Sequence, residues 1–228
     1  MAVDPTKRFH PMTDGVFAAI FDLDGVLTST SARHEESWRD AAERFGFRVT
    51  PESLKATRSV PRATSLAALL DHAGVRLDQT ARDAVMAFKN ARYKELIAGL
   101  KPGDAFPGAR EALVRCRDLG LRVGVASASM NSREVLERLA LLDLVQHVAD
   151  PREAAPKPSA EIYGISCAAL GAFPQHAICI EDGAPMIANL RAEGMYTVGV
   201  GDSGLGAHEY VPAIADWDAA ATLARLRG

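Results

Sequence analysis

The chain has 228 residues, of which 48% are hydrophobic and 24% are charged. These fractions are close to the average for globular domains, and they exclude a collagen, a coiled coil and a globally disordered protein. Its 26 Lys and Arg residues against 29 Asp and Glu residues give a net charge of −3. There is no basic excess to attract nucleic acid or an anionic membrane, so we expect neither as a partner.

The length lies between one and two domains of typical size. Residues 1–14 mix Pro, Lys, Arg and Asp without periodicity, which predicts a loose tail, and they contain no apolar signal segment. Cys116, Cys167 and Cys179 lie far apart and form no CxxC pair, so neither a disulfide framework nor a zinc site is indicated. We expect a soluble, cytoplasmic protein that is a monomer.

Short, continuous apolar runs predict strands at residues 16–21, 121–126, 177–180 and 196–200. Runs that are apolar on both faces are typical of buried parallel strands. Helical periodicity lies between them, and Gly120, Gly171 and Gly194 stand where the helices should end. Asn131 with Glu134 resembles a helix N-cap and its capping-box partner. Strands that alternate with helices predict an α/β fold with a Rossmann-like, doubly wound parallel sheet.

Residues 29–102 interrupt this alternation, because their apolar positions all have helical spacing. The segment that follows, residues 101–108, is rich in Pro and Gly and is typical of a hinge. We therefore expect an all-helical domain at 29–102, inserted into an α/β core made of residues 15–28 and 103–228.

Polar residues gather where the predicted strands end, and in an open α/β sheet ligands bind outside the carboxyl ends of the strands. Mg²⁺ prefers oxygen ligands, a carboxylate can be a phosphoryl acceptor, and a second carboxylate can be a general acid and base. A lysine neutralises charge on a phosphoryl group. Each residue alone is more typical of a turn, a helix cap or a surface position, but together they indicate a Mg²⁺-dependent phosphoryl-transfer site: Asp22, Asp24, Ser127, Ser129, Lys157, Glu181 and Asp182.

These residues carry a resemblance to a known family. Residues 21–28 (FDLDGVLT) resemble the first signature of the haloacid dehalogenase superfamily, and Ser127, Lys157 and the pair Glu181-Asp182 resemble the other three signatures in order. The helical insertion resembles the C1-type cap of that superfamily. From about Phe17 onward the chain is similar to the β-phosphoglucomutase group, most specifically at residues 30–38, 60–66, 89–90, 106–108, 126–129, 131, 149–151 and 199–201.

The resemblance implies a role for each matching residue. Asp22 would be the nucleophile and a Mg²⁺ ligand, and Asp24 the general acid and base, with its backbone carbonyl on the metal. Glu181 and Asp182 would complete the metal site. Ser127 and Lys157 would hold the transferring phosphate. The remaining matches would orient the acid/base, the hinge and the sugar phosphate: Thr30, His34, Trp38, Arg62, Lys89, Asn90, Ala128, Ser129 and Asn131.

The implied reaction converts β-glucose 1-phosphate into glucose 6-phosphate through the 1,6-bisphosphate. The chain differs from the usual sequence of this group at three places. Met130 occupies a position where the group usually has Lys, Ser29 replaces a typical Asp in the hinge, and residues 183–186 differ from the usual Ser-x-x-Gly. A phosphatase on a small sugar phosphate is therefore an alternative, and a non-enzymatic phospho-acceptor regulatory domain is a more remote one. The large insertion argues against the regulatory domain.

Overall fold

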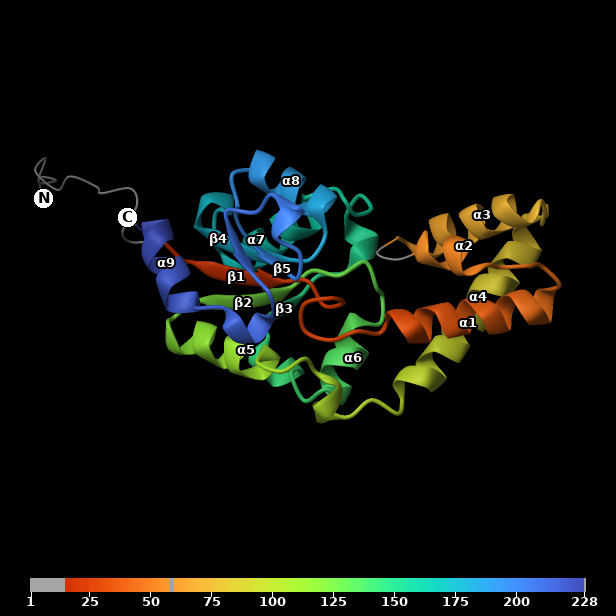
Figure 1. The fold of residues 1–228 in the computed structure, drawn as a ribbon, viewed down its shortest axis with the longest axis horizontal. Helices are drawn as coiled ribbons and strands as arrows, with labels where there is room; N and C mark the ends of the chain where they lie inside the picture. Colours follow the sequence, from red (N-terminus) through yellow and green to blue (C-terminus); the bar gives the residue numbers. More distant parts are fainter. Residues whose placement is uncertain (1–14, 58–59, 228) are drawn as a thin grey trace, which may run out of the picture.

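The computed structural model describes residues 15–57 and 60–227, so the predicted tail at 1–14 lies outside the described residues. Its centre is a six-stranded sheet in which every neighbouring pair of strands is parallel (Figure 1). The order β3-β2-β1-β4-β5-β6 confirms the predicted doubly wound α/β fold. The strands are β1 (Ala18–Phe21), β2 (Arg122–Val125), β3 (His147–Val148), β4 (Ala177–Glu181), β5 (Tyr196–Val200) and β6 (Glu209–Val211).

The predicted strands correspond to β1, β2, β4 and β5, and the prediction missed the two edge strands. β3 has 2 residues and β6 has 3, and most of these residues are at least partly exposed. Edge strands of this length leave no apolar run in the sequence, because only one side of the strand is paired and little of it is buried.

Alternate residues of β1 face opposite layers of helices. Ala19 and Phe21 belong to a hydrophobic cluster with α5 (Ala109–Asp118), α6 (Ser132–Arg138) and α9 (Ala219–Arg227). Ala18 and Ile20 belong to a second cluster with α7 (Glu161–Leu170) and α8 (Ala184–Ala192). Successive side chains of a strand point to opposite faces, so the continuous apolar run of β1 is what a sheet covered on both sides requires.

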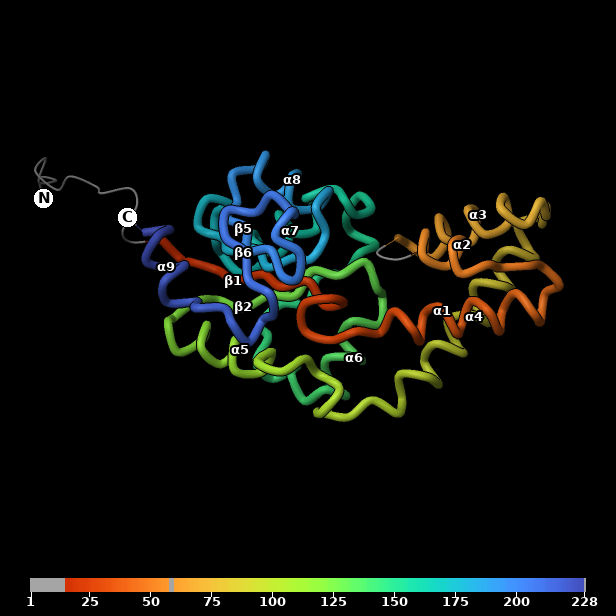
Figure 2. The backbone as a smooth tube through the Cα atoms, in the orientation of Figure 1, coloured from red at the N-terminus to blue at the C-terminus, as the bar shows by residue number. Residues whose placement is uncertain are grey.

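The helices that follow β1 form a separate group at one end of the sheet (Figure 1). We call this group the helical insert: α1 (Ser31–Phe45), α2 (Pro51–Lys55), α3 (Arg62–Ala73) and α4 (Gln79–Ile97). It has its own hydrophobic cluster, which includes Trp38, Leu66, Leu69 and Val85. Figure 2 shows the chain passing between the sheet and the insert twice, before α1 and after α4.

Helix α4 belongs to both parts. Val85 in its first half packs in the cluster of the insert, whereas Tyr93 and Ile97 in its second half pack in the cluster of the sheet. The apolar spacing of α4 predicted its helical structure, but it could not show that one helix is shared between two cores.

The remaining short helices are single 3₁₀ turns. They are η1 (Pro102–Asp104), η2 (Leu142–Leu144), η3 (Pro151–Glu153), η4 (Pro174–His176), η5 (Ser203–Leu205) and η6 (Ile214–Asp216). Among the described residues, no helix is both long enough and apolar enough to cross a lipid bilayer.

The predicted helix ends and the N-cap position of Asn131 are confirmed, but the capping hydrogen bond expected of Asn131 is not formed. Gly120, Gly171 and Gly194 have φ values of +78°, +69° and +77°, the left-handed conformation of a C-terminal glycine. Asn131 stands at the N-cap of α6, but its side chain makes no capping hydrogen bond. The Asn131 amide instead donates to Asn90 Oδ1 on α4 at 3.1 Å, because the neighbouring insert offers it an acceptor.

Gly108 lies where the start of α5 packs closely against η6. It has φ +83°, and a Cβ atom would lie 2.3 Å from Ala215 Cα. Gly120 has a similar φ of +78° but nothing within 4 Å of a Cβ position. Gly120→Ala should lower the free energy of unfolding by about 1–2 kcal/mol through backbone strain alone. Gly108→Ala should cost about 1–3 kcal/mol more through overpacking. Urea unfolding measures both, and equal losses would contradict the close packing.

Candidate active site

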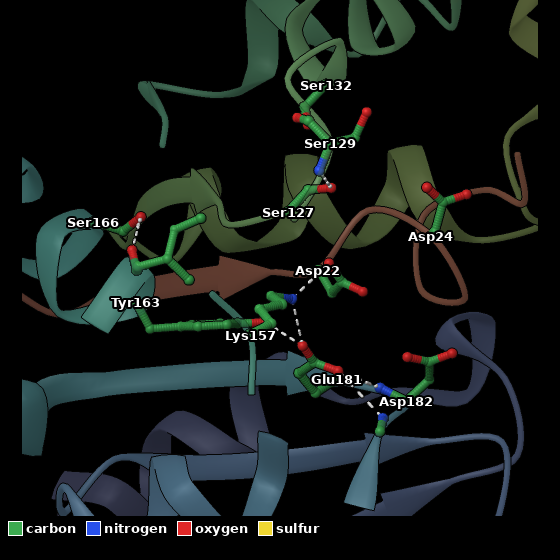
Figure 3. Close-up of polar contacts among 12 residues, drawn as sticks. Asp22, Asp24, Ser127, Ser129, Ser132, Lys157, Tyr163, Ser166, Glu181 and Asp182 are labelled. Carbon is green, nitrogen blue, oxygen red and sulfur yellow. Dashed lines mark hydrogen bonds and ion pairs between the residues drawn. The ribbon is translucent and has the colours of Figure 1, made fainter. Parts of the chain in front are cut away.

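Two buried carboxylates meet at the ends of the central strands. The register pairs Phe21 of β1 with Ile180 of β4, so the residues that follow, Asp22 and Glu181, are neighbours at the same sheet edge (Figure 3). The Asp22 N–H continues the ladder by donating to the Ile180 carbonyl at 2.9 Å. Asp182 is exposed, and one oxygen from each of these three carboxylates lies within 4.8 Å of the others.

The ammonium of Lys157 lies between the two buried carboxylates. Its Nζ is 2.9 Å from Asp22 Oδ1 and 2.6 Å from Glu181 Oε1. Burial disfavours the charged ammonium, but these two carboxylates raise the pKa of Lys157 overall. Burial also raises the pKa of the Asp22 carboxyl, an effect that Lys157 opposes.

Glu181 is held by further donors. The Tyr163 hydroxyl donates to its Oε1 at 3.0 Å, and the N–H groups of Asp182 and Gly183 donate to its Oε2 at 3.0 and 3.2 Å. One ammonium cannot balance three clustered carboxylates, and hard oxygen donors of this kind suit Mg²⁺. Asp22, Glu181 and Asp182 therefore fit a divalent cation.

Asp24 is outside this group of three. Its Oδ1 accepts hydrogen bonds from the N–H and the hydroxyl of Thr30, the latter at 2.8 Å, and Tyr93 donates to the same hydroxyl at 2.9 Å. Burial raises the pKa of the Asp24 carboxyl, and the bonds from Thr30 oppose this. A carboxyl with a raised pKa suits proton transfer.

The loop after β2 presents hydroxyls on the same side. The N–H of Ser129 donates to Ser127 Oγ at 3.1 Å, and the N–H of Asn131 donates to Ser129 Oγ at 3.2 Å. In the view of Figure 3, Ser127 lies between Ser129 and Asp22. Ala128 lies between them and, like both serines, lines the cavity in front of the carboxylates.

Polar groups from both parts of the molecule form a second cluster. Arg62 Nη2 of α3 donates to Asn90 Oδ1 of α4 at 2.6 Å, and Asn131 of the sheet domain donates to the same oxygen at 3.1 Å. The guanidinium and the two amides are suited to binding an anion. Met130 stands beside them with 49% of its surface exposed, and it adds no charge.

His34 and Lys89 form a pair inside the insert. Lys89 Nζ lies 2.7 Å from His34 Nδ1, and it stands over the rings of Trp38 and Tyr93 at 5.2 and 4.8 Å. Burial, followed by the charge of Arg62, lowers the pKa of Lys89 to about 7. Burial and the charge of Lys89 lower the pKa of His34 well below its usual value.

One cavity of about 880 Å³ brings most of the predicted residues together. Three of the predicted residues do not line the cavity, but each makes a hydrogen bond with a residue that does: Thr30 with Asp24, Asn90 with Arg62 and Glu181 with Lys157. Tyr93 and Tyr163 also contribute through their hydrogen bonds to Thr30 and Glu181, and no sequence pattern predicts this, because buried tyrosines have the same spacing as any core residue. The predicted residues that line the cavity are Asp22, Asp24, His34, Trp38, Arg62, Lys89, Ser127, Ala128, Ser129, Asn131, Lys157 and Asp182.

Gly25 controls how closely the loop after β1 approaches Asp182. It has φ +94°, and a Cβ atom would lie 1.9 Å from Asp182 Oδ2. Gly25→Ala should displace this carboxylate and weaken Mg²⁺ binding, measured by calorimetry, by roughly 10- to 100-fold, as changes around metal ligands do. Gly46→Ala, with φ +75° and open space around its Cβ position, is the matched control. Unchanged Mg²⁺ affinity in Gly25→Ala would contradict a role for Asp182 as a ligand.

Comparisons with known proteins agree with this geometry. Residues 18–194 match the model of the haloacid dehalogenase-like hydrolase family. The chain is 33% identical to a β-phosphoglucomutase of Bacillus subtilis over 81% of its own length and 83% of that protein. It is 28% identical to a phosphorylated carbohydrates phosphatase of Thermotoga maritima over 78% of its own length and 82% of that protein.

Among solved structures, a β-phosphoglucomutase from Clostridium difficile matches with a TM-score of 0.86 at 27% identity. The match covers 92% of this chain and 97% of the other. The similarity therefore includes the helical insert as well as the sheet. The chain belongs to the haloacid dehalogenase-like hydrolase family, in the group that contains the β-phosphoglucomutases.

Proposed function

We propose that this protein is a Mg²⁺-dependent phosphomutase that converts β-glucose 1-phosphate into glucose 6-phosphate through the 1,6-bisphosphate. The observation that carries the proposal is a cavity with two anion-binding regions. Asp22 and Lys157 are in one, and Arg62 and Asn131 are in the other. A ligand with a single phosphate needs only the first, whereas a sugar bisphosphate would occupy both.

In the first half-reaction, Asp22 is the nucleophile. When a bisphosphate phosphorylates the enzyme, a carboxylate oxygen of Asp22 forms a bond to phosphorus as the bond from phosphorus to the sugar oxygen breaks. Asp24 donates a proton to that leaving oxygen. In the second half-reaction, a sugar hydroxyl attacks the aspartyl-phosphate, Asp24 takes the hydroxyl proton, and Asp22 is released as a carboxylate.

The surrounding residues neutralise charge and hold the reacting groups. Lys157 and Ser127 would contact the transferring phosphoryl oxygens, and Thr30 orients the Asp24 carboxyl through its two hydrogen bonds. Mg²⁺ bound by Asp22, Asp24, Glu181 and Asp182, with Asp24 contributing its backbone carbonyl, would supply further positive charge to the phosphoryl group. These residue roles follow from the family resemblance, and the geometry described above supports them.

Groups from both the insert and the sheet domain would distinguish the two ends of the substrate. Arg62, Asn90 and Asn131 would hold the phosphate that does not react, with Ser129 beside them. His34 and Lys89 would contact the sugar side of Asp24, next to Trp38. We propose that residues 29–102 act as a cap that excludes water from the aspartyl-phosphate while the sugar bisphosphate turns around.

A phosphatase acting on a small phosphorylated sugar is the second candidate. Met130 favours it, because this side chain is half-exposed beside the second anion-binding region and contributes no charge there. The similarity to a phosphorylated carbohydrates phosphatase agrees with it as well. The nucleophile, the acid/base and the metal site would be the same in both reactions, and only the acceptor of the phosphoryl group differs. The monomeric state and the cytoplasmic location stay predictions.

The product distribution decides between the candidates. With β-glucose 1-phosphate, Mg²⁺ and a trace of the 1,6-bisphosphate, the mutase should form glucose 6-phosphate well in excess of free phosphate. Asp22→Asn should abolish both products, because an amide is a poor nucleophile, while its unfolding curve shows that it remains folded. Phosphate release without glucose 6-phosphate would contradict the mutase. An unaffected rate in Asp22→Asn would contradict the assigned nucleophile.

A substitution of Arg62 tests whether the second region binds a phosphate. Arg62→Ala should lower kcat/KM with the bisphosphate by roughly 10- to 100-fold, the loss expected for a charge-assisted hydrogen bond. Hydrolysis of a small aryl phosphate, which has no second phosphate, should change by less than about twofold on the same argument. Arg48→Ala, at an exposed position on the same insert, is the control for loss of a positive charge. Equal losses with both substrates would place Arg62 outside the second region.

A further inference from the structure

Two side-chain contacts connect α4 of the insert to α6 of the sheet domain. The Asn131 amide donates to Asn90 Oδ1 at 3.1 Å, and Lys94 Nζ lies 3.1 Å from Glu134 Oε2. Lys94 follows Asn90 by four positions and Glu134 follows Asn131 by three, so each residue of the ion pair stands one helical turn from a residue of the amide pair. The two contacts are therefore parallel connections between the same two helices.

The position of α4 determines the geometry of the second anion-binding region. Asn90 is on this helix, and its Oδ1 is the common acceptor for Arg62 of α3 and Asn131 of the sheet domain. The amide contact alone would allow α4 to rotate about it, and that rotation would change the orientation of Asn90 relative to Arg62 of α3. A second contact one turn further along the helix opposes that rotation.

The other charges on this part of α4 face elsewhere. Arg92 binds Asp40 and Glu36 of α1 and Glu95 of its own helix. Lys94 instead faces the sheet domain, with 49% of its side chain exposed, while that of Glu134 is 26% exposed. The pair is therefore partly shielded, and among the ion pairs of the described residues it is the one that joins α4 to α6.

We propose that Lys94 and Glu134 are positioning residues for the phosphate that does not react, because their ion pair keeps Arg62, Asn90 and Asn131 convergent. This inference rests on the proposed function. A partly exposed ion pair contributes modestly to stability, but a small free energy is sufficient to change the population of a two-state cap. The pair should therefore affect use of a bisphosphate far more than it affects the chemistry at Asp22.

Charge reversal tests the pair directly. Lys94→Glu and Glu134→Lys each place like charges opposite one another, whereas the double variant restores an ion pair with its charges exchanged. Each single variant should raise the half-saturating concentration of glucose 1,6-bisphosphate by about 3- to 5-fold, the upper part of the range for a partly exposed pair. The double variant should return to within about twofold of the parent. Hydrolysis of a small aryl phosphate should change little in all three.

Lys55→Glu makes the same change of charge at an exposed position on α2 and should leave the half-saturating concentration unaltered. A shift of equal size in Lys55→Glu would assign the effect to net charge and overturn the proposal. An unchanged constant in both single variants, or a double variant no better than the single ones, would also overturn it.

A distance measurement tests the inference without any sugar substrate. Cys116, Cys167 and Cys179 are all buried, so spin labels can be attached to Asp71→Cys on α3 and Arg138→Cys on α6, both exposed positions. Dipolar spectroscopy should show a broader or shifted distance distribution in Lys94→Glu, and the double charge reversal should restore the parent distribution. An unaltered distribution in Lys94→Glu overturns the proposal. If the parent does not use the bisphosphate, the proposed function fails while these distances still test the ion pair.

Discussion

The bridge from Lys157 to Asp22 and Glu181 is the interaction on which the site depends. Two carboxylates buried side by side repel each other, and taking them out of water costs several kcal/mol each. The ammonium 2.9 and 2.6 Å away offsets part of this cost, and Tyr163 and two backbone N–H groups also donate to Glu181. The residual negative charge is what makes this edge of the sheet suitable for a divalent cation and an incoming phosphate.

Helix α4 connects this centre to the insert. Its buried Tyr93 donates to Thr30, which in turn donates to Asp24, so the position of the Asp24 carboxylate depends on a helix that is also part of the insert. Its neighbouring residues Lys89 and Asn90 face His34 and Arg62. One helix therefore connects Asp24 with the Arg62, Asn90 and Asn131 cluster, and this connection between the two clusters is what the proposed function uses.

Much of this arrangement could be predicted, because strand ends and side-chain type are local properties. The apolar runs before Asp22, Ser127 and Glu181 identified buried strands, and parallel strands carry the residues after them to one edge. One predicted hydrogen bond is not formed, because the side chain instead binds a residue that is distant in the sequence. Asn131 has the sequence context of a helix cap, but its amide binds Asn90, which is 41 positions away in the chain. The edge strands β3 and β6 were missed because two or three half-buried residues leave no periodic signal.

The sequence by itself determined the class of the sheet, and it predicted helices in residues 29–102 and the residue types of the candidate site, since these depend on residue type and on spacing within a few positions. The tertiary structure decided which groups meet. Lys157 and Asp22 are 135 positions apart, and Tyr93, which has the spacing of a core residue, contacts Thr30. Contacts of this kind depend on how whole helices and strands pack, and that packing is set by the summed burial of many side chains.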